Sequence, residues 1–427
     1  MTHPTVTVRS LLAVGALVLS LTALTALTAL CPAQYALLAQ PIPVAERFAV
    51  TEWRLPATSP PFAAILFVPA TWLPVATLKA VVVVGNVLLL ALLVRLSWRF
   101  VARRPTTATD PVPTSAPATS ATPQLSVPVA VPLSVLVAVG LWLEPVFRTV
   151  LHGEISLALA CLILWDLTRP DHALGKGFAI GIAAGVELTP ALFIAYLLLT
   201  GRPGDVRAGL TALASLIGTM LLGALVLPRS SLDFWTLRVF GAGWPGEAWS
   251  ADNQSLQGLF ARALHTPEPG VGWAVACVVI TFAGLWLARR AVVRAGHEAW
   301  GVLAIALTAL LVSPVSWSHH WVWCVPLLAV LFAEGRWRTA AAVALVFSAR
   351  TFLLVPHEGG AELQLPWWQQ VPASPYPLLA LAVLAALAYG LYRHRRHRRK
   401  TVPRLPPVRP LPLSQLPASN SSASTMR

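Results

Sequence analysis

Long apolar stretches separated by short basic loops constrain this fold more than any other feature of the sequence. The chain has 427 residues, of which 56% are hydrophobic and only 11% charged, whereas about 25% of residues are charged in a soluble domain. Several apolar runs, among them 10–30, 75–96 and 208–227, reach the roughly 20 residues that a helix needs to cross a bilayer. We therefore predict an all-α polytopic membrane protein.

Basic residues gather in loops between the apolar runs, and such loops face the cytoplasm by the positive-inside rule. The clusters are Arg95, Arg99, Arg103 and Arg104; Arg169 and Lys176; Arg202 and Arg207; Arg289, Arg290 and Arg294; Arg336 and Arg338; and 393–400. Placing them all on one side predicts about ten full spans, with both termini in the cytoplasm. The net charge of +14 comes from basic residues in these short loops and not from one basic face. We therefore expect a membrane-lipid environment and no nucleic-acid partner.

The apolar stretch 177–200 lies between two clusters that should both be cytoplasmic, so a single crossing does not fit. Thr189-Pro190 interrupts it near the middle, and proline breaks a helix. We predict a re-entrant helical hairpin with Glu187 at its tip, since non-helical backbone at that depth requires surrounding protein or a water-filled cavity. The alternative for Glu187 is a snorkelling or paired carboxylate without a function.

Composition divides the chain into four predicted parts. Residues 1–104 hold the first two spans and an extracytoplasmic loop at 31–61. Residues 105–126 are rich in Pro, Thr, Ala and Ser and read as a disordered cytoplasmic linker. Residues 127–395 form the transmembrane bundle, and 396–427 are a basic, Pro/Ser-rich cytoplasmic tail.

The segment Leu311–Pro326, LVSPVSWSHHWVWCVP, interrupts two apolar runs with a polar and aromatic break. Tryptophan is enriched where hydrocarbon meets headgroups, so the break is expected at a membrane surface. His319 and His320 there indicate a polar cavity beside the bilayer. An interfacial turn with two solvated imidazoles is the alternative.

The predicted extracytoplasmic face collects polar residues that could act together on a substrate. We take Glu52, Glu46, His319 and His320 as candidate catalytic residues, and Glu144, Arg148, Glu154, Asn253, Gln254 and Arg262 as candidate substrate-binding residues. Carboxylates, imidazoles and guanidinium groups fit general-base catalysis with an anionic leaving group, and equally a polar conduit of a transporter. Asn253 is also a candidate N-cap of a short amphipathic helix ending near Arg262.

Motifs for other chemistries are missing from the sequence. There is no Walker loop, no GxGxxG after a strand, and no His/Cys/Asp cluster with metal-ligand spacing. We therefore predict no metal and no cofactor.

Five segments resemble the successive motifs of glycosyltransferase family 87: PPFAAILFVP, LEPVFRTVLHGE, GVELTPALFIAYLLLTGR, ADNQSLQGLFAR and SPVSWSHHWVW. They occur in the family order between about Pro60 and Pro326. The resemblance implies a GT-C-type helical bundle in the bacterial cell membrane. It also implies transfer of a hexose, with mannose expected, from a polyprenyl-phosphate donor to a glycolipid or polysaccharide acceptor of the envelope. Reaction would occur on the extracytoplasmic face by one inverting displacement.

The chain departs from that family pattern at positions that bear on catalysis. The family's Asp after the first span is missing around Cys31–Tyr35. The resemblance therefore leaves the role of base to Glu52 or Glu46, with Glu52 preferred because it lies nearer the Pro-Pro-Phe segment. Glu154 stands where Gln is usual, and Glu187 where Lys is usual. The implied alternative is a diverged, non-catalytic paralogue that binds or transports polyprenyl lipids.

In this resemblance, His319 and His320 lie near the donor phosphate or the acceptor, and Arg148 is directed toward the phosphate. Asn253 and Gln254 shape the site.

Overall fold

The computed structural model describes residues 15–20, 22, 59–102, 132–238, 248–356 and 359–401. Within these residues every regular element is a helix, and the single extended pairing is one bridge between Asn253 and Trp317. The predicted all-α class is confirmed. Glu46 and Glu52, the linker 105–126 and most of the tail lie outside the described residues, so the division into four parts stays a prediction.

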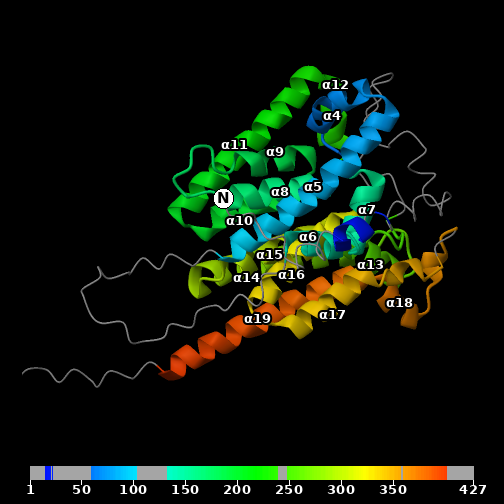
Figure 1. The fold of residues 1–427 in the computed structure, drawn as a ribbon. Helices are drawn as coiled ribbons and strands as arrows, with labels where there is room; N and C mark the ends of the chain where they lie inside the picture. The colour runs from blue at the N-terminus through cyan, green and yellow to red at the C-terminus, as the bar shows by residue number, and fades with distance from the viewer. Residues whose placement is uncertain are drawn as a thin grey trace, which may run out of the picture.

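The helices, in chain order, form one assembly (Figure 1). They are α4 (Pro61–Phe67), η1 (Val68–Trp72), α5 (Val75–Ala102), α6 (Leu133–Gly140), α7 (Glu144–His152), α8 (Ser156–Leu167), α9 (Phe178–Val186), α10 (Ala191–Thr200), α11 (Pro203–Val226), α12 (Pro228–Asp233), η2 (Phe234–Arg238), α13 (Leu256–Ala263), α14 (Gly270–Ala295), α15 (Glu298–Val312), η3 (Ser318–Trp323), α16 (Cys324–Ala333), α17 (Trp337–Ser348), η4 (Thr351–Leu353), η5 (Ala361–Gln364), α18 (Trp367–Ala373) and α19 (Pro375–Thr401).

Among the described residues, four helices are long and apolar enough to span a membrane, or up to five if one bent pair counts as a span. They are Thr77–Ala102, Pro203–Val226, Gly270–Ala295 and Pro375–Arg393. The predicted number of about ten full spans is not confirmed. Prolines and polar breaks divide several apolar stretches into helices of 10–17 residues, which are shorter than the roughly 20 residues of a full crossing.

The bent pair is α6 and α7, which meet at 80°. A straight helix through the apolar run 127–143 would leave Glu144 to Arg148 in the following loop. Instead a new helix begins at Glu144, with Pro145 in its first turn, a position where proline is tolerated. Gly153 ends this helix in a left-handed conformation (φ 68°). The bend thus brings charged side chains of α7 against the interior.

The stretch 177–200 forms a helical hairpin beside α11. Gly177 lies against Ala208 and Gly185 against Thr219, so α9 runs parallel to α11. α10 then returns and leads through Gly201 directly into α11. The entry to α9 and the exit from α10 therefore lie at the same end of α11, as the basic clusters had predicted.

A buried carboxylate fixes the start of this hairpin. Asp166 is fully buried and accepts hydrogen bonds from the backbone N–H groups of Gly177, Ala179 and Ile180 at 2.9–3.2 Å. Backbone N–H groups at a helix start lack intrahelical partners, and a negative charge there is favourable. Asp166 thus holds the N-terminus of α9.

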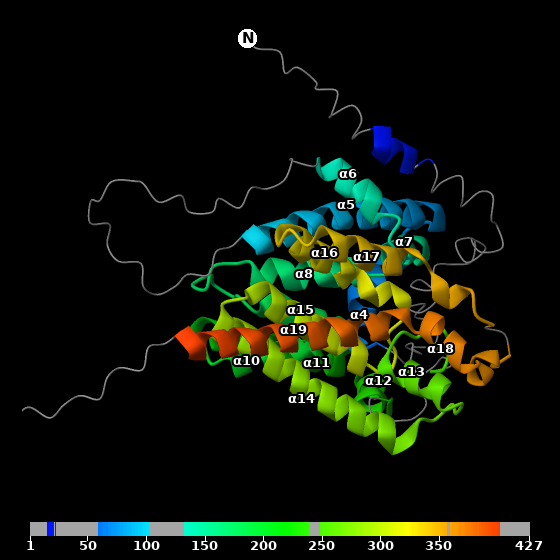
Figure 2. The same ribbon diagram turned by 90° about the horizontal axis from the view of Figure 1, so that it is seen from below.

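Basic loops and polar loops occupy opposite ends of the assembly. Arg202 pairs with Glu298 at 2.8 Å, and Lys176 with Asp171 at 2.8 Å, at the end where α15 begins. α15 runs from Glu298 away from this end toward Ser313 and η3. In Figures 1 and 2, α13 and α18 lie at the right of the assembly, and α10 and the C-terminal end of α19 at the left.

Candidate functional site

Two polar loops meet at the end of α15 and form the frame of the site. Asn253 pairs with Trp317 as an antiparallel bridge. The Ser318 N–H donates to the carbonyl oxygen of Asp252 at 3.1 Å. The NQSL and SWSHHW segments are separate motifs in the sequence. In the structure these contacts join them into one unit.

Asn253 holds these two loops together with its side chain, which is fully buried. Its Nδ2 donates to the carbonyl oxygens of Ala248 (2.8 Å) and Pro314 (3.1 Å). Its Oδ1 accepts from the N–H groups of Ser255 (3.2 Å) and Ser316 (2.9 Å). The amide uses both donors and its acceptor within the protein.

The N-cap of α13 is Ser255, not Asn253. The Ser255 hydroxyl accepts a hydrogen bond from the Gly258 N–H at 3.2 Å, which is the geometry of an N-cap. The predicted amphipathic helix is present as α13, with its cap two residues later.

Gln254 and Arg262 are also fully buried and join the frame to the start of α19. Gln254 Nε2 donates to the Ala373 carbonyl at 2.9 Å, and its Oε1 accepts from the Tyr376 N–H at 3.2 Å. Arg262 Nη2 donates to the Ser374 hydroxyl at 2.8 Å. Burial lowers the pKa of Arg262 to about 10, which leaves it protonated at neutral pH. Gln254 and Arg262 therefore connect α13 and the loop before it to the segment between α18 and α19.

Glu144 and Arg148 of α7 belong to a second polar network. Glu144 is 1% exposed and accepts a hydrogen bond from the Tyr376 hydroxyl. Arg148 Nε lies 3.8 Å from Glu144 Oε1, and Arg148 Nη1 lies 2.6 Å from Asp252 Oδ1. The side chains of Arg148 and Asp252 are 21% and 32% exposed, so this network reaches the surface at the Arg148–Asp252 pair.

Sequence reasoning missed Asp252, Tyr376 and Ser318. Arg148 Nη1 also donates to the Ser318 hydroxyl at 3.3 Å, which links α7 to η3. Asp252 could have been proposed as a site residue from the sequence, because it directly precedes Asn253 in the ADNQSL motif. Nothing in the sequence near Tyr376 connects it to Glu144.

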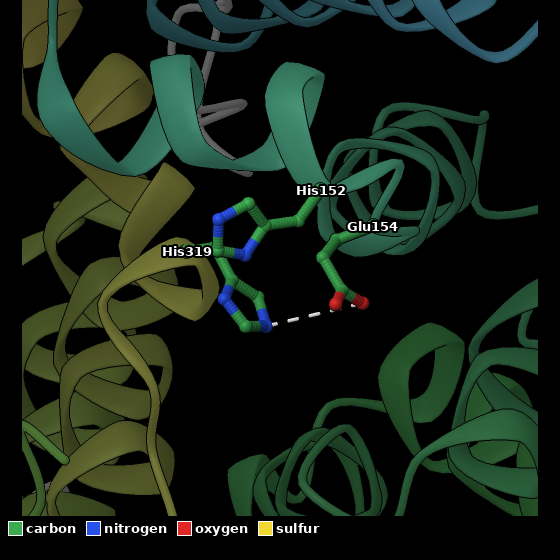
Figure 3. A group of neighbouring side chains, drawn as sticks. All are labelled: His152, Glu154 and His319. Atoms are coloured by element: carbon green, nitrogen blue, oxygen red, sulfur yellow. Dashed lines mark ion pairs between the residues drawn. The ribbon is translucent and has the colours of Figure 1, made fainter. Parts of the chain in front are cut away.

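His319 and Glu154 approach each other at the C-terminal end of α7, together with His152 (Figure 3). His319 Nε2 lies 3.9 Å from Glu154 Oε2, and their side chains are 10% and 14% exposed. The rings of His152 and His319 have centroids 6.4 Å apart. One potential ligand atom from each of the three residues lies within 4.8 Å of the others. The sequence contained no such cluster at metal-ligand spacing, because α7 and η3 are far apart in the chain.

His320 faces a different region, although its ring centroid is only 4.5 Å from that of His319. It lines a pocket at the tip of the α9–α10 hairpin. The other lining residues are Ser156, Leu159, Ala160, Ile163, Glu187, Thr189, Pro190, Phe193, Ala306, Ala309, Leu310 and Trp323. The adjacent histidines therefore connect two polar regions, one with Glu154 and one with Glu187.

Comparison with known proteins decides the family. The sequence model of Glycosyltransferase family 87 matches residues 58–314, more than half of the chain. The chain belongs to glycosyltransferase family 87. The matched region contains α7, the Asp252–Ser255 loop and the hairpin, and it ends just before the two histidines.

Curated relatives agree with this family assignment. The chain is 34% identical over 342 residues to a protein of Mycobacterium tuberculosis (strain ATCC 25618 / H37Rv) named polyprenol-phosphate-mannose-dependent alpha-(1-2)-phosphatidylinositol mannoside mannosyltransferase, covering 77% of this chain and 75% of the relative. The protein of the same name in Mycolicibacterium smegmatis is 30% identical over 346 residues, covering 77% and 74%. No solved structure gives a significant match. The predicted family and the glycosyltransferase activity are confirmed, and the long apolar helices fit a multi-pass membrane enzyme.

Proposed function

We propose that this family 87 enzyme transfers mannose from polyprenyl-phosphate-mannose to a phosphatidylinositol mannoside, an envelope glycolipid. The observation that carries this proposal is the pair of relatives with that donor and acceptor in their names, which align with about three quarters of the chain. The polar frame at α7, α13 and η3 is the corresponding candidate site.

The reaction is assigned to the extracytoplasmic face. Lys176, Arg202 and Arg289 lie at the end of the assembly where α15 begins, and basic loops face the cytoplasm. Arg289 Nε donates to the Leu199 carbonyl at 2.8 Å, which places α14 at that end too. The site lies at the opposite end of α15. The C-terminal end of α19 lies at the same end of the assembly as α10 in Figures 1 and 2, which supports a cytoplasmic C-terminus. The cytoplasmic N-terminus stays a prediction from the sequence.

The α9–α10 hairpin is proposed to be re-entrant. Its helices have 9 and 10 residues, about 14–15 Å each at 1.5 Å per residue, which is about half of the 30 Å hydrocarbon core. Glu187 at the tip lines the pocket with His320. A carboxylate at that depth is expensive unless a polar cavity surrounds it, so the pocket is a candidate route for the polar part of the substrates.

Arg148 and His319 are proposed to face the donor phosphate. Arg148 donates a hydrogen bond to the Ser318 hydroxyl, and His319 follows Ser318 in the chain. Cationic and hydrogen-bonding groups stabilise a departing phosphate.

The chemistry would be a single displacement. The acceptor hydroxyl oxygen forms a bond to the anomeric carbon, while the bond from that carbon to the phosphate oxygen breaks and the configuration inverts. A carboxylate accepts the hydroxyl proton. Glu52 and Glu46 remain candidates for that base, and Glu187 joins them because it lines the pocket with His320.

The test is transfer of labelled mannose from polyprenyl-phosphate-mannose to phosphatidylinositol mannoside by the purified chain in proteoliposomes. The proposal expects a labelled, α-linked product. Glu52→Gln, Glu46→Gln and Glu187→Gln identify the base, because only loss of the base should lower the rate about 100-fold or more. Donor binding without any product would instead support a non-catalytic lipid-binding paralogue.

A further inference from the structure

We infer that His152, Glu154 and His319 form a binding site for a divalent transition-metal ion of the zinc class. The potential ligand atoms of these three side chains lie within 4.8 Å of one another. They come from the last turn of α7, from the residue after its C-cap, and from η3 (Figure 3). The picture shows both imidazoles and the carboxylate converging on one region between these elements.

The backbone holds the three side chains in this arrangement. Gly153 is left-handed, and the Glu154 N–H donates back to the Thr149 carbonyl at 3.0 Å. The Thr149 hydroxyl, which donates to the Pro145 carbonyl at 2.7 Å, also lies 3.3 Å from the His319 carbonyl oxygen. The turn of α7 and the start of η3 are therefore tied through one residue, which limits how far the ligands can separate.

The spacing of the potential ligand atoms is close to the spacing around a bound ion. His319 Nε2 and Glu154 Oε2 are 3.9 Å apart, beyond the about 3.2 Å limit of a good N–H···O bond. Zinc bonds to His nitrogen and carboxylate oxygen are about 2.0–2.2 Å long, which separates tetrahedral ligands by about 3.3–3.5 Å. Small side-chain rotations from the observed spacing reach that geometry.

The chemistry of the three ligand side chains favours one class of metal ion. Two imidazoles and one carboxylate favour zinc and similar transition metals over magnesium and calcium, which prefer oxygen ligands. Three protein ligands also leave one position open in a tetrahedral site, as in catalytic zinc centres. The low exposure of His319 and Glu154, 10% and 14%, would protect such an ion from bulk water.

The role of the ion rests on the proposed function. His319 follows Ser318 in the chain, and Arg148 contacts Ser318, so an ion held by His319 would lie near the guanidinium proposed to meet the donor phosphate. An ion there would accept a phosphate oxygen and neutralise charge that develops as the sugar leaves. No oxidation or additional reactant is needed, because the ion acts only as a Lewis acid.

Metal binding is measured on the full-length chain, stripped with a chelator and then incubated with Zn²⁺ alone. We expect about one zinc ion per chain by elemental analysis, and visible absorption of a tetrahedral site when Co²⁺ replaces zinc. His319→Ala and the isosteric Glu154→Gln should lose the ion. His172→Ala, at an exposed histidine of the loop before α9, should keep it. Equal zinc binding by the wild type and both ligand variants, each still monodisperse on gel filtration, would overturn the site.

Transfer activity then separates this inference from the proposed function. Chelation should lower mannose transfer about 100-fold, with recovery on adding Zn²⁺, if the ion stabilises the leaving phosphate. Undiminished transfer by the metal-free chain would overturn the role of the ion and leave the proposed function intact. Bound zinc without transfer under any condition would overturn the proposed function and leave the metal site standing.

Discussion

Arg148 Nη1 lies 2.6 Å from Asp252 Oδ1, and this contact joins α7 to the polar loop before α13. The same guanidinium contacts the Ser318 hydroxyl at 3.3 Å. One side chain therefore connects three segments of the site. Its orientation depends on Asp252, since the more buried Glu144 is 3.8 Å away.

Asp252→Ala should reduce mannose transfer at least about tenfold, because Arg148 loses its ion-pair partner at 2.6 Å and no longer has a fixed direction. Arg148→Lys should cause a similar loss, since lysine cannot contact Asp252 and Ser318 with one planar group. Initial rates at saturating donor measure both effects. Wild-type rates in Asp252→Ala would remove this pair from the site.

Asn253→Asp should destabilise the fold, although the two side chains have the same shape. The carboxylate would face the carbonyl oxygens of Ala248 and Pro314, which the amide now contacts as a donor. Buried groups left without partners cost roughly 1–3 kcal/mol each. The thermal unfolding temperature in detergent should fall by several degrees. Gln364→Glu, the same chemical change at an exposed position, is the matched control and should leave that temperature unchanged.

Gly181→Ala should weaken the packing of the hairpin on α11. A Cβ at Gly181 would lie 2.3 Å from the Ala212 carbonyl oxygen and 2.4 Å from the Ser215 Cβ, so α9 would have to move. Overpacking of this kind costs about 1–3 kcal/mol. Gly218→Ala on α11 has no atom within 4 Å of the new Cβ and is the control. Equal unfolding temperatures for the two variants would contradict the close approach of α9 and α11.

Trp367→Cys should react with a membrane-impermeant maleimide in intact cells, and Leu174→Cys only after permeabilisation. The two native side chains are 85% and 95% exposed, so access depends on the side of the membrane and not on burial. Trp367 begins α18 at the site end, and Leu174 lies in the basic loop before α9. The unsubstituted chain, with Cys161 and Cys324 buried, gives the background. Labelling of Leu174→Cys from outside would reverse the proposed topology.

The sequence predicted the hairpin because charge restricts topology. Arg169 and Arg202 flank an apolar stretch with a Thr189-Pro190 break, and only a fold-back returns the chain to the same side. Hydrophobicity alone could not give the number of spans. An apolar run does not show where a helix bends, nor whether each resulting helix is long enough to cross the membrane. The 80° bend between α6 and α7 is such a case.

The sequence indicated which polar residues would lie near one another but not how they would be arranged, and their roles in the site stay predictions. Glu144, Arg148, Asn253 and His319 do lie at one end of the assembly, as expected from their places in the polar loops. Which of them bond one another depends on the packing of distant segments, so the Tyr376 contact to Glu144 had no signal in the sequence. The His152–Glu154–His319 cluster was missed for the same reason, because motif spacing detects only ligands that are near in the chain.

The most direct measurement of the central claim is mannose transfer by purified His319→Ala in proteoliposomes, beside the wild type and His172→Ala. The account predicts labelled phosphatidylinositol mannoside product from the wild type and from His172→Ala. It predicts a rate at least about 100-fold lower in His319→Ala, because the group proposed to face the donor phosphate is removed. Equal rates in all three proteins would contradict the assignment of the α7–η3 region as the transferase site.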